Sequence, residues 1–97
     1  MTQIELVPEV AEDFERILNH LSLHQVENPA LRIQSIIDAI DILRTNPRIG
    51  RPAGKNTREL IIGHGSRGYI ALYRYAAPLN ICFVLAIRSQ REAGDLR

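Results

Sequence analysis

Apolar side chains recur every three or four residues in two segments of the chain, which is the spacing of one face of an α-helix. The first segment predicts a helix from Pro8 to about His24, because proline is tolerated in a first helical turn and acids follow it near the positive end of the helix dipole. The second segment predicts a helix from about Ala30 to Arg44, with Asn28 as its expected N-terminal cap. The two apolar stripes consist of Val10, Phe14, Ile17, Leu18 and Leu21, and of Ile33, Ile36, Ile37, Ile40 and Leu43.

Runs of β-branched and aromatic residues predict strands in the rest of the chain. The expected strands are Ile4–Val7, Arg58–Ile62, Tyr69–Tyr75 and Ile81–Arg88. Residues 46–57 are too polar and too rich in Pro and Gly for an element. Short connections between the last three strands indicate an antiparallel meander. The order β-α-α-β-β-β predicts a single α+β domain over residues 1–97, with an antiparallel helix pair on one face of an antiparallel sheet.

Alternation along the last strand predicts which side chains face the helices. The odd-numbered residues from Ile81 to Ile87 are expected in the core, and the even-numbered residues from Cys82 to Arg88 on the opposite face. On the preceding strand, three tyrosines alternate with Arg74 and two aliphatic residues. If the tyrosines line the open face, they and the arginines form a surface for stacking and phosphate contacts. The alternative is that the tyrosines form a core or partner-binding face.

The composition is that of an ordinary globular domain, with 45% hydrophobic and 24% charged residues. No apolar run approaches the roughly 20 residues that span a bilayer. The first residues lack the basic and apolar regions of a secretory signal. The single cysteine, Cys82, has no partner for an internal disulfide and is expected to be a small packed side chain. We therefore expect a cytoplasmic protein.

Charge is divided unevenly along a chain whose net charge is only +1. Residues 1–43 carry two basic residues and eight acids, and residues 44–97 carry ten basic residues and three acids. Eleven of the twelve basic residues are arginine, whose planar fork suits carboxylate and phosphate groups. The basic half favours an anionic partner. The alternative is that the acidic helices and the basic sheet partly neutralise each other.

Histidines and glycines raise three further candidates. His20 and His24 lie four residues apart, but no ligand at zinc-like spacing accompanies them, so we predict no metal site. The Gly63–Gly68 segment has the spacing of a dinucleotide-binding loop, yet it joins two strands instead of opening a helix, so we predict no cofactor. His64 in this turn is a candidate acid or base, with a solvated turn residue as the alternative.

Three segments of the basic half resemble a known family. They are Asn46–Pro52, Gly68–Arg74 and Leu85–Gly94. Together with the paired helices before them, they resemble toxins of the RelE/ParE superfamily, from bacterial type II toxin–antitoxin pairs, over nearly the whole chain. The resemblance implies that a cognate antitoxin holds the toxin silent in a hetero-oligomer. It also implies that the antitoxin lies across the helices and the sheet edge, and the expected contacts are Phe14, Leu18 and Ile37.

The RelE branch of this superfamily implies an enzyme, a ribosome-dependent endoribonuclease that cleaves messenger RNA. The 2′-hydroxyl attacks the adjacent phosphate, which requires a proton acceptor, a proton donor and cations that stabilise the phosphorane. Superfamily members commonly have histidine and tyrosine where this chain has Ser89 and Asp95. Arginine is a poor proton carrier at neutral pH, so these two departures argue against nuclease activity.

The ParE branch implies inhibition of DNA gyrase by binding, with trapping of cleaved DNA and no catalytic residues. On this hypothesis the chain is the toxin of a plasmid-stabilisation module. The expected target contacts are Arg58, Arg74, Arg88 and Arg91. Two alternatives stay open: a RelE-like nuclease that uses the same arginines on the ribosome, and a non-toxic homologue that only binds its antitoxin.

Overall fold

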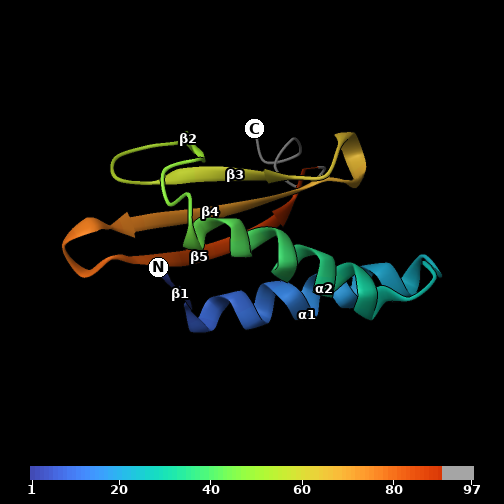
Figure 1. Cartoon of the computed structure of the whole chain (residues 1–97). Coiled ribbons are helices and arrows are strands. Elements are labelled where there is room, and N and C mark those ends of the chain that lie inside the picture. Colours follow the sequence, from blue (N-terminus) through green and yellow to red (C-terminus); the bar gives the residue numbers. More distant parts are fainter. Residues whose placement is uncertain (91–97) are drawn as a thin grey trace.

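The computed structural model describes residues 1–90 as two helices packed on one side of a five-stranded sheet (Figure 1). The helices are α1 (Pro8–Leu23) and α2 (Pro29–Ile40), and α2 continues into the 3-10 helix η1 (Asp41–Arg44). Two further 3-10 turns, η2 (Gly65–Arg67) and η3 (Ala77–Leu79), connect strands. The strands are β1 (Gln3–Leu6), β2 (Arg51–Pro52), β3 (Arg58–Ile62), β4 (Tyr69–Ala76) and β5 (Ile81–Ser89).

The sheet has the strand order β1-β5-β4-β3-β2. Strands β3, β4 and β5 form the expected antiparallel meander, and the α+β class with both helices on one face is confirmed. Two expectations were wrong. Strand β1 pairs in parallel with β5, so the sheet is mixed, because α1 and α2 carry the chain back before the meander begins. The loop over residues 46–57 also contains a strand, β2, which pairs with Arg58 and Glu59.

Both helices begin at a proline and bury one stripe, as their periodicity predicts. Helix α1 ends at Leu23. The second helix is α-helical only as far as Ile40 and finishes as the 3-10 turn η1. Asn28 precedes α2 as expected, but its side chain makes no capping hydrogen bond. Its backbone is left-handed, with φ at 52°, and this conformation, which asparagine tolerates, turns the chain between the helices.

The core lies between the helices and the sheet, and a bulge in β5 decides which strand residues reach it. Leu72 pairs with Ala86, but the next residue, Tyr73, pairs with Val84, so Leu85 is an extra residue in the ladder. The alternation therefore changes phase at Leu85. The buried core consists of Val10, Ile17, Leu21, Ile36, Ile40, Leu43, Leu60, Tyr69, Ala71, Tyr73, Cys82, Val84 and Ile87.

The predicted core face of β5 was therefore correct for the residues that follow Leu85 and wrong for the residues that precede it. Ile87 is buried and Arg88 is exposed, as expected. Cys82 and Val84, which were expected on the opposite face, are fully buried in the core. Ile81 and Phe83 are only partly buried. Burial raises the pKa of the Cys82 thiol, so this side chain is a packed neutral group at neutral pH.

Helix α1 also hydrogen-bonds to the edge of β5 that β1 leaves open. Strand β1 ends opposite Val84, and beyond that point Asp13 Oδ2 accepts a hydrogen bond of 2.9 Å from the Ile87 N–H. Arg16 Nη2 donates to the Ile87 carbonyl at 3.1 Å, and its Nη1 pairs with Asp13 at 2.8 Å. These two side chains fix α1 on the sheet and close this part of the edge to further strand pairing.

Candidate target-binding surface

The open face of the sheet, opposite the helices, carries two of the four arginines predicted to contact a target. Arg74 pairs with Phe83 and Arg88 pairs with Ile70, and each alternates with residues that are buried under the helices. Both arginines are exposed. Four residues along β4 separate their positions, which corresponds to about 13 Å. Most side chains between them are apolar or small: Ile61, Ile70, Leu72, Phe83 and Ala86. Glu59, opposite Leu72 on the same face, is charged and pairs with Arg51 at 3.0 Å.

The tyrosines of β4 do not share this face. Tyr69 and Tyr73 are buried beneath the helices, and Tyr75 packs partly against the same core. The conditional hypothesis of a tyrosine and arginine surface on the open face is therefore wrong, and the alternative of a tyrosine core holds for Tyr69 and Tyr73. Strand β4 alternates regularly on both sides of Tyr73, so all three tyrosines lie on the side opposite Arg74.

Arg58 occupies a different position from Arg74 and Arg88. It pairs with the buried Tyr73, so it lies on the helix side of the sheet, at the start of β3. Its Nη1 donates to the carbonyls of Gly50 at 2.7 Å and of Arg48 at 3.1 Å. Arg58 therefore holds the loop before β2 in place, a structural task that its sequence position did not reveal.

The same loop is anchored to the core by Tyr73. The Gly50 N–H donates to Tyr73 Oη at 2.8 Å, and both groups are buried. Burial raises the pKa of Tyr73 above its ordinary value of 10, and this effect exceeds the lowering caused by the Gly50 hydrogen bond. The phenol is therefore neutral at physiological pH and serves as a fixed acceptor for the loop.

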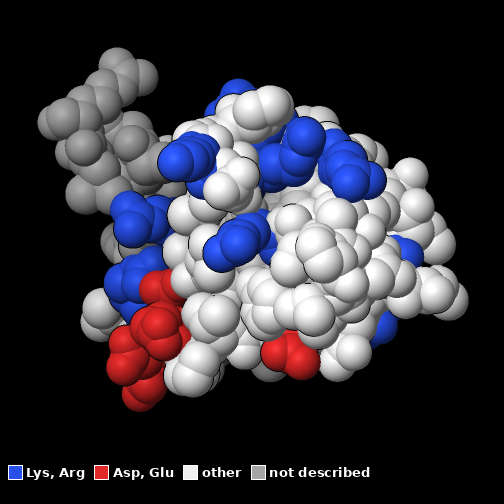
Figure 2. Space-filling view, turned by 90° about the vertical axis from the view of Figure 1, so that its left-hand side faces the viewer, with Lys and Arg blue, Asp and Glu red and all other residues white. Residues whose placement is uncertain are grey.

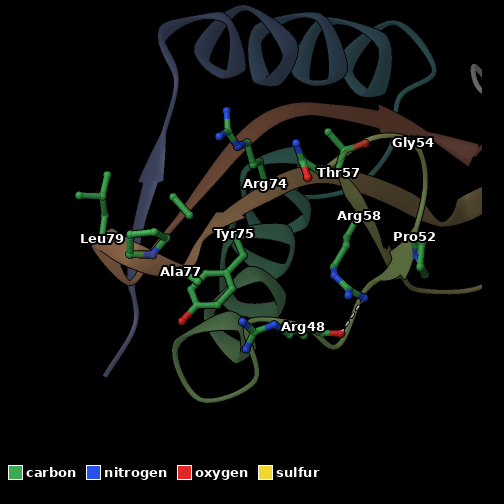
Figure 3. Close-up of a pocket in the computed structure, with 12 residues that line it drawn as sticks. Arg48, Pro52, Gly54, Thr57, Arg58, Arg74, Tyr75, Ala77 and Leu79 are labelled. Atoms are coloured by element: carbon green, nitrogen blue, oxygen red, sulfur yellow. Dashed lines mark hydrogen bonds between the residues drawn. The ribbon is translucent and has the colours of Figure 1, made fainter.

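An open pocket of about 660 Å³ lies at this end of the molecule, and we call it the arginine pocket (Figure 3). It brings Arg58 and Arg74 together with Arg48, which sequence reasoning did not select as a target contact. The Arg48 guanidinium lies over the Tyr75 ring, 4.8 Å from its centroid. Only the motif Asn46–Pro52 marked this arginine in the sequence.

The remaining residues of interest lie on the helix side or outside the described part. Ser89 pairs with Tyr69 and is partly buried, so the position where superfamily members commonly carry histidine is on the side opposite Arg88. Arg91 and Asp95 lie outside the described residues. His64 is exposed beside Arg67 in a smaller pocket near the start of β4.

The expected antitoxin contacts differ in exposure. Leu18 on α1 is 38% exposed and Ile37 on α2 is 39% exposed, and both flank the buried stripes of their helices. Phe14 is partly buried and packs against the core. The rings of His20 and His24 are 4.4 Å apart at their centroids. Within residues 1–90, no group of three His, Cys, Asp or Glu side chains is suited to hold a metal ion.

Solved structures with the same fold include bacterial toxins. The chromosomal ParDE toxin–antitoxin system from P. aeruginosa matches with a TM-score of 0.75 at 22% identity, over 92% of this chain and 96% of that one. The intact E. coli RelBE toxin–antitoxin complex matches with a TM-score of 0.62 at 13% identity, over 92% and 96%. The isolated E. coli RelE toxin matches with a TM-score of 0.63 at 11% identity, over 99% and 96%.

Sequence comparison separates the two branches that share this fold. No curated protein sequence matches the chain significantly. No helix within residues 1–90 is long and apolar enough to cross a membrane. The family described as the ParE toxin of the type II toxin–antitoxin system, parDE, matches residues 4–94. Because this match spans both helices, the loop at Gly50 and the whole sheet, the chain belongs to the ParE toxin family.

Proposed function

We propose that this ParE-family chain inhibits DNA gyrase by binding it through the open face of the sheet. The observation that carries the proposal is the composition of that face, where Arg74 and Arg88 flank apolar side chains and the nearby Glu59 is already paired with Arg51. Arginine beside apolar and aromatic groups is typical of the residues that dominate protein–protein affinity. A gyrase-inhibiting toxin acts in the cytoplasm, which agrees with the location expected from the sequence.

Binding fits this face better than RNA cleavage does. A general acid or base needs a pKa near the working pH, and the guanidinium groups of Arg74 and Arg88 do not meet this requirement. The three tyrosines of β4 alternate with Arg74 and lie on the helix side of the sheet. Ser89 pairs with Tyr69, so it lies on the helix side as well. On the open face, β4 and β5 therefore offer cations and apolar contacts to a target but no proton carrier, and the carboxylate of Glu59 on β3 is held in an ion pair with Arg51.

Supercoiling assays with purified gyrase test this proposal. We expect the wild-type chain to inhibit supercoiling and the double variant Arg74→Ala/Arg88→Ala to require at least about tenfold more protein, because each arginine is an expected interface contact worth about 1 kcal/mol or more. Arg44→Ala is the matched control, since Arg44 makes an exposed ion pair with Asp41 in η1, away from the open face. Equal inhibition by the double variant would place the gyrase contact elsewhere. Growth arrest with intact supercoiling and cleaved messenger RNA would support the RelE-like alternative.

The proposal includes a cognate antitoxin that covers the outer faces of α1 and α2. Leu18 and Ile37 are exposed apolar side chains outside the buried helix stripes, and Phe14 is partly buried against the core. Acids line the same two helices, so a basic amphipathic segment fits both the charge and the apolar contacts. Solved structures of the same fold come from a ParDE system and a RelBE toxin–antitoxin complex.

Binding of a cognate antitoxin tests this second surface. We expect Leu18→Asp/Ile37→Asp to weaken the complex at least about tenfold, because two apolar contacts are lost and two carboxylates must be desolvated in their place. Ile49→Asp is the control, since Ile49 is 51% exposed but lies in the loop before β2. Circular dichroism verifies that all variants fold. Unchanged binding by the double variant would exclude these helix positions as contacts.

A further inference from the structure

Three arginines from separate segments of the chain line the arginine pocket. Arg48 comes from the loop before β2, Arg58 begins β3 and Arg74 lies near the end of β4. Figure 3 shows Arg48 beside the Tyr75 ring, Arg58 directed toward the backbone of the same loop, and Arg74 on the other side of β4. Contacts within the chain thus hold two of these three cations near one another before any ligand arrives.

Two of the guanidinium groups are held by contacts that leave their charge unneutralised. Arg48 stacks on Tyr75, and Arg58 donates one nitrogen to two backbone carbonyls. The ion pairs among residues 1–90 involve Arg16, Arg44 and Arg51, and none of them involves an arginine of the pocket. Arginines fixed in this way lose little side-chain entropy on binding a ligand, which favours affinity.

The described lining of the pocket consists of donors and apolar groups. Asn56 and Thr57 add uncharged donors to the three arginines, and neither Asp nor Glu is among the described lining residues. Figure 2 looks onto this end of the molecule and shows Lys and Arg side chains over its upper part, with the acidic side chains along its lower margin. Such a site takes a ligand that presents several anionic acceptor oxygens.

We propose that the arginine pocket binds the phosphodiester backbone of a nucleic-acid strand. Arginine, asparagine and threonine are side chains that contact phosphate oxygens in nucleic-acid complexes. The three arginines are distributed around a pocket of about 660 Å³, which suits successive phosphates better than a single small anion. Lys55, in the exposed loop between β2 and β3, extends the basic surface beyond the pocket. This inference goes beyond the proposed function, since binding to gyrase through the open face needs no nucleic-acid contact.

Fluorescence anisotropy with a labelled single-stranded DNA of about 12 nucleotides, a length within the site sizes of single-strand binders, tests the inference. Three phosphate contacts predict that log Kd depends on log salt with a slope of about 2, since each contact on a single strand contributes about 0.7. Arg48→Gln is expected to weaken binding several-fold to about tenfold at low salt and to lower the slope by about 0.7. Arg44→Gln and Arg32→Gln, which remove cations outside the pocket, are the matched controls.

The results separate this inference from the proposed function. Equal losses in Arg48→Gln and in the two controls would overturn the pocket as the site and indicate attraction by overall charge. Binding of a Glu-rich peptide but not of DNA, with the same dependence on Arg48, would show that the pocket is a protein site. Absence of DNA binding by a wild-type chain that still inhibits supercoiling would overturn only the nucleic-acid inference. A wild-type chain that binds DNA but does not inhibit supercoiling would overturn only the gyrase proposal.

Discussion

Val84→Asp is expected to prevent folding, whereas Phe83→Asp is expected to leave the fold intact. Val84 is fully buried under the helices, so the substitution loses its apolar burial, worth about 2 kcal/mol, and places a carboxylate in the core, which costs several kcal/mol more. Together these effects approach the whole free energy of unfolding of a small domain, about 5–10 kcal/mol. Phe83 lies on the open face beside Arg74, where a carboxylate stays in contact with water.

Urea unfolding monitored by circular dichroism distinguishes these two outcomes. We expect Phe83→Asp to unfold cooperatively with a loss of about 1–2 kcal/mol from its partial burial, and Val84→Asp to lack a folded baseline. Phe83→Ser serves as a control for loss of the ring without a new charge. The opposite order of stability would mean that the bulge at Leu85 is absent in solution, because an unbroken alternation places Phe83 in the core.

The bulge also explains where sequence reasoning about the sheet failed. Strict alternation assigns faces correctly only within an uninterrupted ladder, and one extra residue moves every side chain beyond it to the other face. Leu85 has no feature that marks it as that residue, since it is a leucine in an aliphatic run. The phase was correct for Ile87 and Arg88 and reversed for Cys82 and Val84, on the far side of Leu85.

The helices and the meander were predictable because the apolar periodicity of the helices and the β-branched and aromatic runs of the strands each extend over many neighbouring residues. Strand β3 matches the expected residues Arg58–Ile62, and the ends of α1, β4 and β5 differ from expectation by a single residue each. The pairing of β1 with β5 was not predictable, because strands at opposite ends of the chain carry no mark of their partner. Strand β2 is only Arg51–Pro52, too short for any periodicity, and the Arg51–Glu59 ion pair of 3.0 Å accompanies its pairing.

The candidate sites were predictable in part. Alternation along β4 separated Arg74 from the tyrosines, but which side faced the helices depended on packing that the local pattern does not encode. Arg58 was selected for its charge, and its hydrogen bonds to the loop carbonyls depend on a fold that brings residues 48 and 50 beside it. Arg48 was not expected in the pocket because its loop lacked any expected structure, although the motif that contains it was part of the family resemblance.

Gly50→Ala is the second substitution for which we expect a large effect. A Cβ at residue 50 would lie 2.6 Å from Tyr73 Cε1, 2.8 Å from Tyr73 Oη and 2.8 Å from the Glu59 carbonyl oxygen. The φ of Gly50 is not in the left-handed region, so the constraint is close approach and not backbone freedom. Tyr73 is fully buried and the Glu59 oxygen belongs to β3, so neither can move away cheaply. We expect a loss of about 3 kcal/mol from overpacking and from strain on the Gly50–Tyr73 hydrogen bond.

Urea unfolding of Gly50→Ala, Tyr73→Phe and their combination tests this packing argument. Tyr73→Phe alone should cost about 1–3 kcal/mol, because it leaves the buried Gly50 N–H without its acceptor. It should not rescue Gly50→Ala, since the contacts with the ring carbon and the Glu59 carbonyl remain. Ile49→Ala, at the exposed neighbouring residue, is the control and should change stability by less than about 1 kcal/mol. Wild-type stability in Gly50→Ala would show that the loop can leave Tyr73 without cost. Arg48 and Arg58 would then no longer be held in the arginine pocket by the fold, and the argument for a preorganised phosphate site would fail with them.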